Sequence, residues 1–226
     1  MEATRGFVIA LVGAESTGKT TLAGALAERL RAETGHGVAV VGEVLREWCE
    51  QAGRTPRIEE QAAIVAEQRR RIDAAAGSHA IVVADTTPLM IAVYHRIVFN
   101  DRSLDEPAGR WHAARVDHTL VTALDLPWVA DGHQRDGEHV RAPVDAALRE
   151  LLAAHCIAWS RVAGVGQARV ESALDAVAPL LRRRPSPRRG LFTRLAERDA
   201  AQPDWPWLCD CDLPDCEHRL RATDPR

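Results

Sequence analysis

The chain has 226 residues, of which 46% are hydrophobic and 27% charged, and a formal net charge of −3. This composition is typical of a soluble globular protein with room for one sizeable domain and an extension. The acidic balance argues against a dedicated nucleic-acid-binding protein. No apolar run approaches the ~20 residues of a membrane span, the N-terminal apolar run is too short for a signal peptide, and the scattered cysteines do not suggest a disulfide framework. We therefore expect a cytoplasmic protein.

The strongest motif lies in a strand–loop–helix segment near the N-terminus. Residues 7–12 form an apolar run of strand length, and residues 13–20 read G-A-E-S-T-G-K-T. Residues 22–30 then place apolar side chains at intervals of three and four, which predicts a helix. Motif and context together indicate a phosphate-binding loop, the P-loop, rather than a chance glycine turn that caps an ordinary helix.

The chemistry of phosphate binding explains this arrangement. Unpaired backbone N–H groups of the loop and of the helix start form an anion site. Lys19, the only lysine in the chain, would reach the β- and γ-phosphates of ATP, and the Thr20 hydroxyl would bind Mg²⁺. The predicted ATP-binding residues are Gly13, Glu15, Ser16, Thr17, Gly18, Lys19, Thr20 and Thr21.

The rest of the chain alternates between strands and helices. Further strands are expected at residues 38–41, 80–85, 118–122 and 156–159. Thr55 and Pro56 are interpreted as the start of a helix that runs to about Ala76, with Ile58 and Ala62 on its buried face. Strands that are apolar on both faces imply a parallel sheet covered on both sides. The predicted fold class is α/β: a P-loop kinase-like parallel sheet of about five strands with helices on both faces, over residues 1–184.

Ligands of such sheets bind beyond the carboxyl ends of the strands. Five residues are expected to follow strands directly and to share that edge. They are Gly13, Glu43, Asp85, Asp125 and Ser160.

Three charged residues near this edge are candidates for chemistry. Asp85 ends an apolar strand and fits the carboxylate that holds Mg²⁺ in P-loop enzymes, although an Asp there also suits a helix cap. Glu43 would accept the proton of a substrate hydroxyl while Arg46 holds a hydroxyl or phosphate. The alternative for both is a solvated first helical turn, where Glu is favourable in any case.

Residues 126–137 have the composition of a lid. A lid needs hinges, a bulky side chain that excludes water and a cation for the transferring phosphoryl group. Two glycines, Trp128 and Arg135 would supply these features, with Arg141 as the second choice for the cation. The alternative is a solvent-exposed loop with an incidental arginine.

Four segments resemble a known family when taken in order. They are G-A-E-S-T-G-K-T-T-L-A at 13–23, E-x-x-R-E at 43–47, A-D-T-T-P-L at 84–89 and D-L-P-W-V-A-D-G at 125–132. Together they resemble the nicotinamide riboside kinase (ribosylnicotinamide kinase) domain of NadR-type proteins, over about residues 6–184. This chain lacks the adenylyltransferase and DNA-binding parts of some members.

The resemblance implies phosphorylation of the ribose 5′-hydroxyl of nicotinamide riboside by Mg·ATP, which yields the mononucleotide for NAD synthesis. On matching positions, Lys19 and Thr20 would bind ATP and Mg²⁺, Asp85 would lie at the metal and the acceptor, and Arg135 would close over the phosphates. The family also implies that the nicotinamide ring stacks on aromatic side chains. The candidates are Tyr94, Trp128 and Trp48, the last with core packing as the alternative.

A second hypothesis comes from a different functional class. The same fold would serve a regulatory ATPase or a nucleotide-dependent binding module whose C-terminal tail binds a protein partner. A GTPase is disfavoured because residues 122–125 read T-A-L-D, without the N-K-x-D pattern that reads guanine.

Residues 185–226 are expected to form a linker and a small Cys- and Trp-containing extension. Residues 182–190 are basic and proline-containing, as is typical of a linker at a domain edge. Cys209, Cys211, Cys216 and His218 would hold one structural Zn²⁺, since four such ligands complete a tetrahedron. Their spacing is not a common zinc pattern, so reduced thiols in a partner-binding segment are the alternative.

Overall fold

A computed structural model of the chain describes residues 5–129 and 137–181. The predicted domain boundary at residue 184, the C-terminal extension and its cysteine motif therefore lie outside the described residues. Within them, the α/β fold class is confirmed.

Five parallel strands form one sheet in the order β2-β3-β1-β4-β5. The strands are β1 Phe7–Val12, β2 Val38–Val41, β3 Ile81–Asp85, β4 His118–Thr122 and β5 Trp159–Val162. The α-helices are α1 Lys19–Thr34, α2 Val44–Ala52, α3 Gln61–Ser78, α4 Pro88–Phe99, α5 Asp105–Arg115, α6 Arg141–Ala154 and α7 Gln167–Leu181. Two 3₁₀ turns, η1 Ile58–Glu60 and η3 Glu138–Val140, precede α3 and α6.

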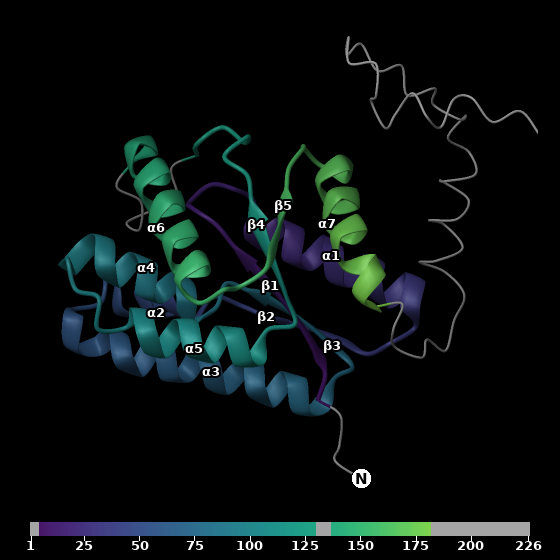
Figure 1. Ribbon diagram of the computed structural model, residues 1–226, viewed down its shortest axis with the longest axis horizontal. Coiled ribbons are helices and arrows are strands. Elements are labelled where there is room, and N and C mark those ends of the chain that lie inside the picture. Colours follow the sequence, from purple (N-terminus) through teal and green to yellow (C-terminus); the bar gives the residue numbers. More distant parts are fainter. Residues whose placement is uncertain (1–4, 130–136, 182–226) are drawn as a thin grey trace, which may run out of the picture. The chain divides into compact units, whose positions relative to one another are not determined.

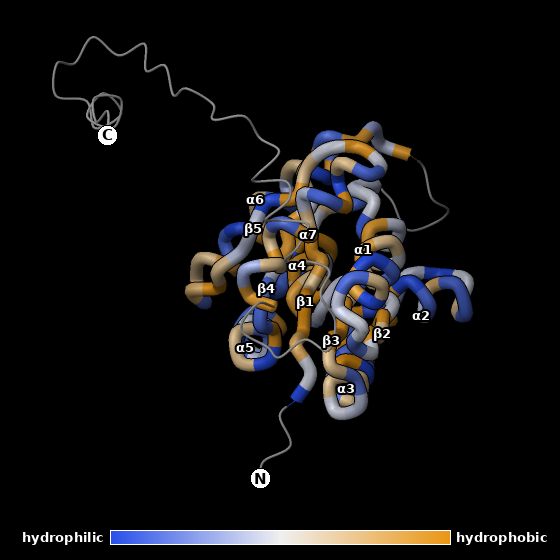
Figure 2. The backbone as a smooth tube through the Cα atoms, turned by 90° about the vertical axis from the view of Figure 1, so that its right-hand side faces the viewer, coloured by the Kyte–Doolittle hydropathy of each residue, from blue (hydrophilic) through white to orange (hydrophobic). Residues whose placement is uncertain are grey.

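Helices cover both faces of the sheet, as the apolar strands predict. On one face, Ala10 and Val12 of β1 pack with α4 and α6, and Val8 packs with α3 and α5. On the other face, α1 and α7 lie together (Figure 1). All six residues of β1 are buried, and Figure 2 shows the hydrophobic strands enclosed between the helices. The sheet is thus a fully covered core that fixes its carboxyl edge in place.

The predicted start of the third helix was wrong. Residues 55–57 are not helical, and after η1 the α-helix begins only at Gln61. Glu60 explains the later start: its carboxylate accepts the Arg57 backbone N–H at 2.7 Å and pairs with the Arg54 guanidinium at 2.7 Å. Ile58 and Ala62, expected on the buried face, are exposed.

The predicted fifth strand was also displaced. Cys156 has a φ of 51° and lies in the turn after α6, so β5 begins at Trp159. Ser160 consequently lies inside the strand, where its hydroxyl is 3.0 Å from Nε2 of His118. The expectation that Ser160 follows a strand at the carboxyl edge of the sheet was therefore wrong.

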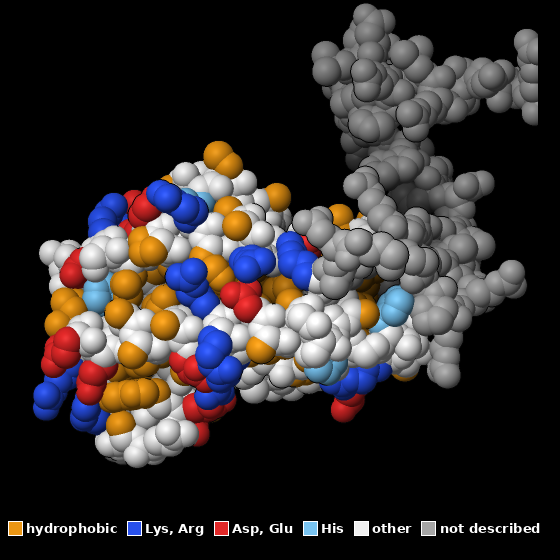
Figure 3. Space-filling view, turned by 90° about the horizontal axis from the view of Figure 1, so that it is seen from below, with side chains coloured by type: hydrophobic (Ala, Val, Ile, Leu, Met, Phe, Trp, Pro, Cys, Tyr) orange, Lys and Arg blue, Asp and Glu red, His pale blue; other side chains and the backbone are white. Residues whose placement is uncertain are grey.

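Charges of both signs are interspersed on the face seen in Figure 3. The described residues pair many of them locally, as in α3, where Glu67 binds the guanidinium groups of Arg70 and Arg71. No described helix is both long and apolar enough to cross a membrane.

Candidate active site

The P-loop, residues 13–20, joins β1 to α1 and depends on glycine at two positions. Gly13 has a φ of 149°, and a Cβ there would lie 2.2 Å from Oγ1 of Thr122. Gly18 caps α1 with a φ of 74°. Gly13 excludes larger residues because the backbone there approaches β4 closely, and Gly18 disfavours them because its positive φ strains a residue with a side chain.

Thr17 ties the loop to the neighbouring strand. It is fully buried, and its hydroxyl donates to the Ala14 carbonyl at 2.8 Å. The Thr122 hydroxyl at the end of β4 in turn donates to Oγ1 of Thr17 at 2.7 Å. The loop is therefore held in shape from inside the protein, a role for Thr122 that the sequence had not revealed.

The ammonium of Lys19 folds back onto the loop. It donates to the carbonyls of Gly13 at 2.9 Å and Ala14 at 2.8 Å. Burial lowers the pKa of Lys19, against the opposing effect of neighbouring carboxylates, of which Glu43 is the strongest. A desolvated ammonium with carbonyl partners only is well placed to exchange them for phosphate oxygens.

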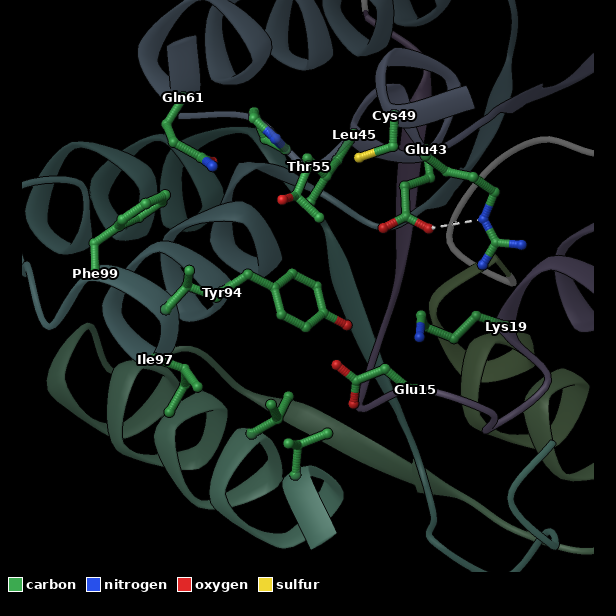
Figure 4. Close-up of a pocket in the computed structure, with 15 residues that line it drawn as sticks. Glu15, Lys19, Glu43, Leu45, Cys49, Thr55, Gln61, Tyr94, Ile97 and Phe99 are labelled. Atoms are coloured by element: carbon green, nitrogen blue, oxygen red, sulfur yellow. Dashed lines mark ion pairs between the residues drawn. The ribbon is translucent and has the colours of Figure 1, made fainter. Parts of the chain in front are cut away.

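A cavity opens from the loop between α2 and α4 (Figure 4). Its end near the loop is polar, and its remaining walls are largely apolar. The polar end consists of Glu15, Lys19, Glu43, Arg46 and Tyr94. The other lining residues are Leu45, Cys49, Thr55, Pro56, Gln61, Ile97, Val98, Phe99, Val140 and Val144. The phosphate-binding loop is thus continuous with a second, partly open site.

Glu43 lies two residues beyond the end of β2, after Gly42, and occupies the N-cap position of α2 without a capping hydrogen bond from its side chain. Its carboxylate lies 3.4 Å from Nε of Arg46, and 11% of its side chain is exposed. Burial raises the pKa of Glu43, with Lys19 acting in the opposite direction. A buried carboxylate with a raised pKa at a cavity wall has the properties of a general base.

Asp85 ends β3 beside the P-loop strand. The sheet register sets it opposite Leu11, two residues before Gly13. It is 2% exposed, and its Oδ1 has no hydrogen-bond partner among the residues that the structure describes. A buried carboxylate oxygen of this kind fits an oxygen-ligated cation such as Mg²⁺, and the exposed Thr20 hydroxyl offers a second oxygen of the type that such a cation binds.

The first part of the predicted lid rests on the P-loop. The Ser16 hydroxyl donates to the Val129 carbonyl at 2.8 Å and accepts the Val129 N–H at 3.1 Å. Arg135 lies in residues 130–136, outside the described residues. Arg141, the second choice for the cation, is 5% exposed, and its Nε and Nη2 have no hydrogen-bond partner.

The aromatic candidates occupy different places. Tyr94 lines the cavity. Trp48 lies outside it and packs against Val44 and Ile64. The Arg54 guanidinium lies over the Trp48 ring, 4.8 Å from its centroid. Trp128 precedes the Val129 contact with Ser16 and also lies outside the cavity. The position of Trp48 agrees with core packing, which was the alternative to a substrate contact for that residue.

Arg169 of α7 is a residue that the sequence had not revealed. Its side chain is buried and donates to Asp125 at 2.7 Å, to the Thr17 carbonyl at 2.8 Å and to the Ala123 carbonyl at 3.2 Å. It thereby joins α7, the end of β4 and the P-loop. No local pattern marks it, since an arginine in an amphipathic helix is usually solvated.

Comparison with known proteins agrees with this geometry. Residues 8–169 match the family described as AAA domain. No curated protein matches the chain in sequence. Among solved structures, a NadR protein in complex with NAD and AMP-PNP is 23% identical with a TM-score of 0.62, and a NadR protein in complex with NR is 24% identical with the same score. Each match covers 77% of this chain and 49% of the NadR chain.

This chain therefore spans about half the length of those NadR structures. A thymidylate kinase from Ehrlichia chaffeensis is 14% identical with a TM-score of 0.54, and the match covers 78% of this chain and 99% of that one. The family match covers more than two thirds of the chain, and the fold agrees with the expected resemblance. The chain belongs to the AAA domain family, with the fold of a NadR-type P-loop kinase domain.

Proposed function

We propose that the chain is an ATP-dependent kinase that phosphorylates the 5′-hydroxyl of a nucleoside, with nicotinamide riboside as the acceptor. The observation that carries the proposal is the continuity of the P-loop with the cavity. Lys19 belongs to both, so a phosphoryl group held by the loop faces a second site. A protein that only hydrolyses ATP needs no such second site, whereas a kinase needs one that excludes water.

In this proposal the transfer depends on positioning and electrostatics. The loop amides and Lys19 hold the phosphates of ATP. Glu43 accepts the proton of the acceptor hydroxyl, and Arg46, 3.4 Å from that carboxylate, orients it and binds the acceptor. The attacking oxygen and the γ-phosphoryl group are thereby brought into line.

Thr20 and Asp85 would hold Mg²⁺, which would neutralise the charge of the transferring phosphoryl group. The partnerless Oδ1 of Asp85 supports this assignment. Arg135 remains the proposed cation of the lid. Arg141 is the described arginine that would share this role, since its buried guanidinium nitrogens lack partners.

The acceptor assignment rests on two features. Tyr94 and the apolar walls offer a surface for a flat base, whereas the carboxylates beside the loop suit the hydroxyls of a ribose. One of the similar NadR structures is described as a complex with NR.

The test is ADP formation with Mg·ATP, with and without nicotinamide riboside, beside a panel of ordinary nucleosides. We expect ADP to form when the riboside is present, with the mononucleotide as product. Lys19→Ala should lower the rate by about 10² or more, because it removes a cation from the transition state. Arg161→Ala, at an exposed position of β5, is the matched control and should leave the rate unchanged.

ADP formation that is indifferent to every acceptor would contradict the kinase. The chain would then be the regulatory ATPase or nucleotide-dependent binding module of the second hypothesis.

A further inference from the structure

His112 of α5 is a fully buried histidine that bridges two hydroxyl groups. Its Nδ1 lies 2.9 Å from Oγ1 of Thr87, and its Nε2 lies 2.8 Å from Oγ1 of Thr119. Thr87 precedes α4 and Thr119 lies in β4, so the imidazole joins three elements. Burial lowers the pKa of His112 to about 3, which keeps the ring neutral. A neutral imidazole has one donor and one acceptor nitrogen, and a hydroxyl can meet either, so both bonds form in either tautomer.

One end of this bridge meets the turn that follows the proposed Mg²⁺ ligand. Asp85 ends β3, and Thr87 caps α4, where its hydroxyl accepts the Leu89 N–H at 3.3 Å. Between them, Thr86 is buried and has a φ of 73°. A β-branched residue with a positive φ is strained, and such strain persists only where the surrounding contacts hold the backbone in place.

The described residues hold this turn from two sides. The Thr86 N–H donates to the Leu11 carbonyl of β1 at 3.0 Å. On the other side, the Thr87 hydroxyl meets His112, which Thr119 fixes to β4. Strand β4 pairs with β1, the strand that leads into the P-loop. The turn after β3 is thereby fixed relative to the strands beside the P-loop.

We propose that His112 is a positioning residue that sets the place of the Asp85 carboxylate relative to the P-loop. This inference rests on the Mg²⁺ role of Asp85 in the proposed function. Mg²⁺ demands nearly ideal octahedral geometry, so its ligands must be held closely in place. Relaxation of the strained turn at Thr86 would move the carboxylate that precedes it. His112 opposes this relaxation through Thr87, although it does not itself line the cavity.

The experiment separates the two ends of the bridge by the length of the side chain at position 112. An asparagine amide reaches about as far as Nδ1 and can meet Thr87, whereas a glutamine amide reaches about as far as Nε2 and can meet Thr119. Calorimetry measures the dissociation constant of ATP with Mg²⁺ and with a chelator in its place. We expect Mg²⁺ to tighten ATP binding by the unmodified chain. His112→Asn should keep this gain within about threefold, and His112→Gln should reduce it by about tenfold, as Asp85→Asn should.

Two controls separate positioning from folding. His79→Asn and His79→Gln, at an exposed position before β3, should leave both dissociation constants unchanged. Thermal unfolding should show a loss of stability in both His112 variants, since each leaves one buried hydroxyl without its partner.

A second pair of variants applies if either change at His112 prevents folding. Thr87→Val and Thr119→Val each remove one end of the bridge at nearly constant shape. Thr87→Val should reduce the gain from Mg²⁺ by about tenfold, and Thr119→Val should keep it within about threefold.

A loss of Mg²⁺ dependence as large in His112→Asn as in His112→Gln, or absent from both, would overturn the positioning role and leave His112 as a residue of the core. The same holds for the pair at Thr87 and Thr119. Because these measurements use no acceptor, they are independent of the kinase proposal. A chain that shows the expected difference but transfers no phosphoryl group would support His112 and contradict the kinase. A chain that phosphorylates the acceptor but binds ATP equally with and without Mg²⁺ would contradict the role of His112 alone.

Discussion

Several of the buried polar atoms that lack a hydrogen-bond partner among the described residues belong to residues of or near the candidate site, whereas others lie elsewhere in the fold. The first group includes Oδ1 of Asp85, Oε2 of Glu15, Oε1 of Gln61 and two guanidinium nitrogens of Arg141. Each such atom costs about 1–3 kcal/mol in the folded state. Proteins tolerate that cost mainly where a ligand later supplies the partner, so these atoms mark the surface that faces substrate and cofactor.

The raised pKa of Glu43 predicts how the activity depends on pH. Because burial raises the pKa of Glu43 above that of an ordinary glutamate, its carboxylate becomes protonated at a higher pH than that of a solvated Glu. A base must be deprotonated to act, so kcat/KM should be constant at high pH and fall as the pH drops through the raised pKa. The measurement is the pH profile of kcat/KM for nicotinamide riboside.

Glu43→Gln should lower kcat/KM by about 10²–10⁴ and abolish the acidic limb of the profile. Glu50→Gln, an exposed position on α2, should leave both unchanged. A variant at Glu43 that keeps the rate and the acidic limb would exclude Glu43 as the base.

Elements marked by a local motif or by a run of apolar residues could be predicted from the sequence. Features that depend on contacts between distant parts of the chain could not. The P-loop, the buried strands and the carboxylate that ends β3 follow from local motif and burial. The start of α3 was missed because Glu60 binds Arg54 and Arg57, and residues 55–56 form a cavity wall instead. Gln61 and Arg169 could not be recognised from the sequence. Only the fold shows that the amide oxygen of Gln61 lacks a hydrogen-bond partner among the described residues and that the guanidinium of Arg169 is buried.

The buried contacts of Arg169 connect three elements, α7, the end of β4 and the P-loop, and we expect their loss to affect all three. Arg169→Met would leave the carbonyls of Thr17 and Ala123 and the carboxylate of Asp125 without their donor. Breaking a buried pair costs about 3–5 kcal/mol. Since 29% of the Asp125 side chain is exposed, we expect a loss of about 2–3 kcal/mol in the free energy of unfolding and a raised KM for ATP.

Urea unfolding of Arg169→Met, Asp125→Asn and the double variant measures this coupling. The two losses should be less than additive, because the residues act as one pair. Additive losses with an unchanged KM for ATP would show that Arg169 stabilises α7 alone and does not position the P-loop.

At the scale of the whole molecule, the described residues contain the sheet, both helical layers and the cavity. Three core clusters of the described residues lie within residues 8–159, and the buried side chains of α7 cover the second face of the sheet by residue 181. The predicted division at residue 184 therefore has a direct consequence. Residues 1–184 should keep the proposed activity without the C-terminal extension.

The comparison of residues 1–184 with the full chain tests this division and the zinc hypothesis together. We expect kcat/KM for the acceptor to agree within about twofold, since every proposed site residue lies before residue 184. Under the zinc hypothesis the full chain binds one equivalent of Zn²⁺ through Cys209, Cys211, Cys216 and His218 and the shorter chain binds none, whereas under the alternative of reduced thiols neither binds Zn²⁺ in a chelator competition assay. Because four protein ligands leave no open position on the metal, removing Zn²⁺ from the full chain should leave the rate unchanged. A shorter chain that folds but loses activity would place part of the catalytic apparatus in residues 185–226, and a full chain that binds no Zn²⁺ would favour a partner-binding role for those thiols.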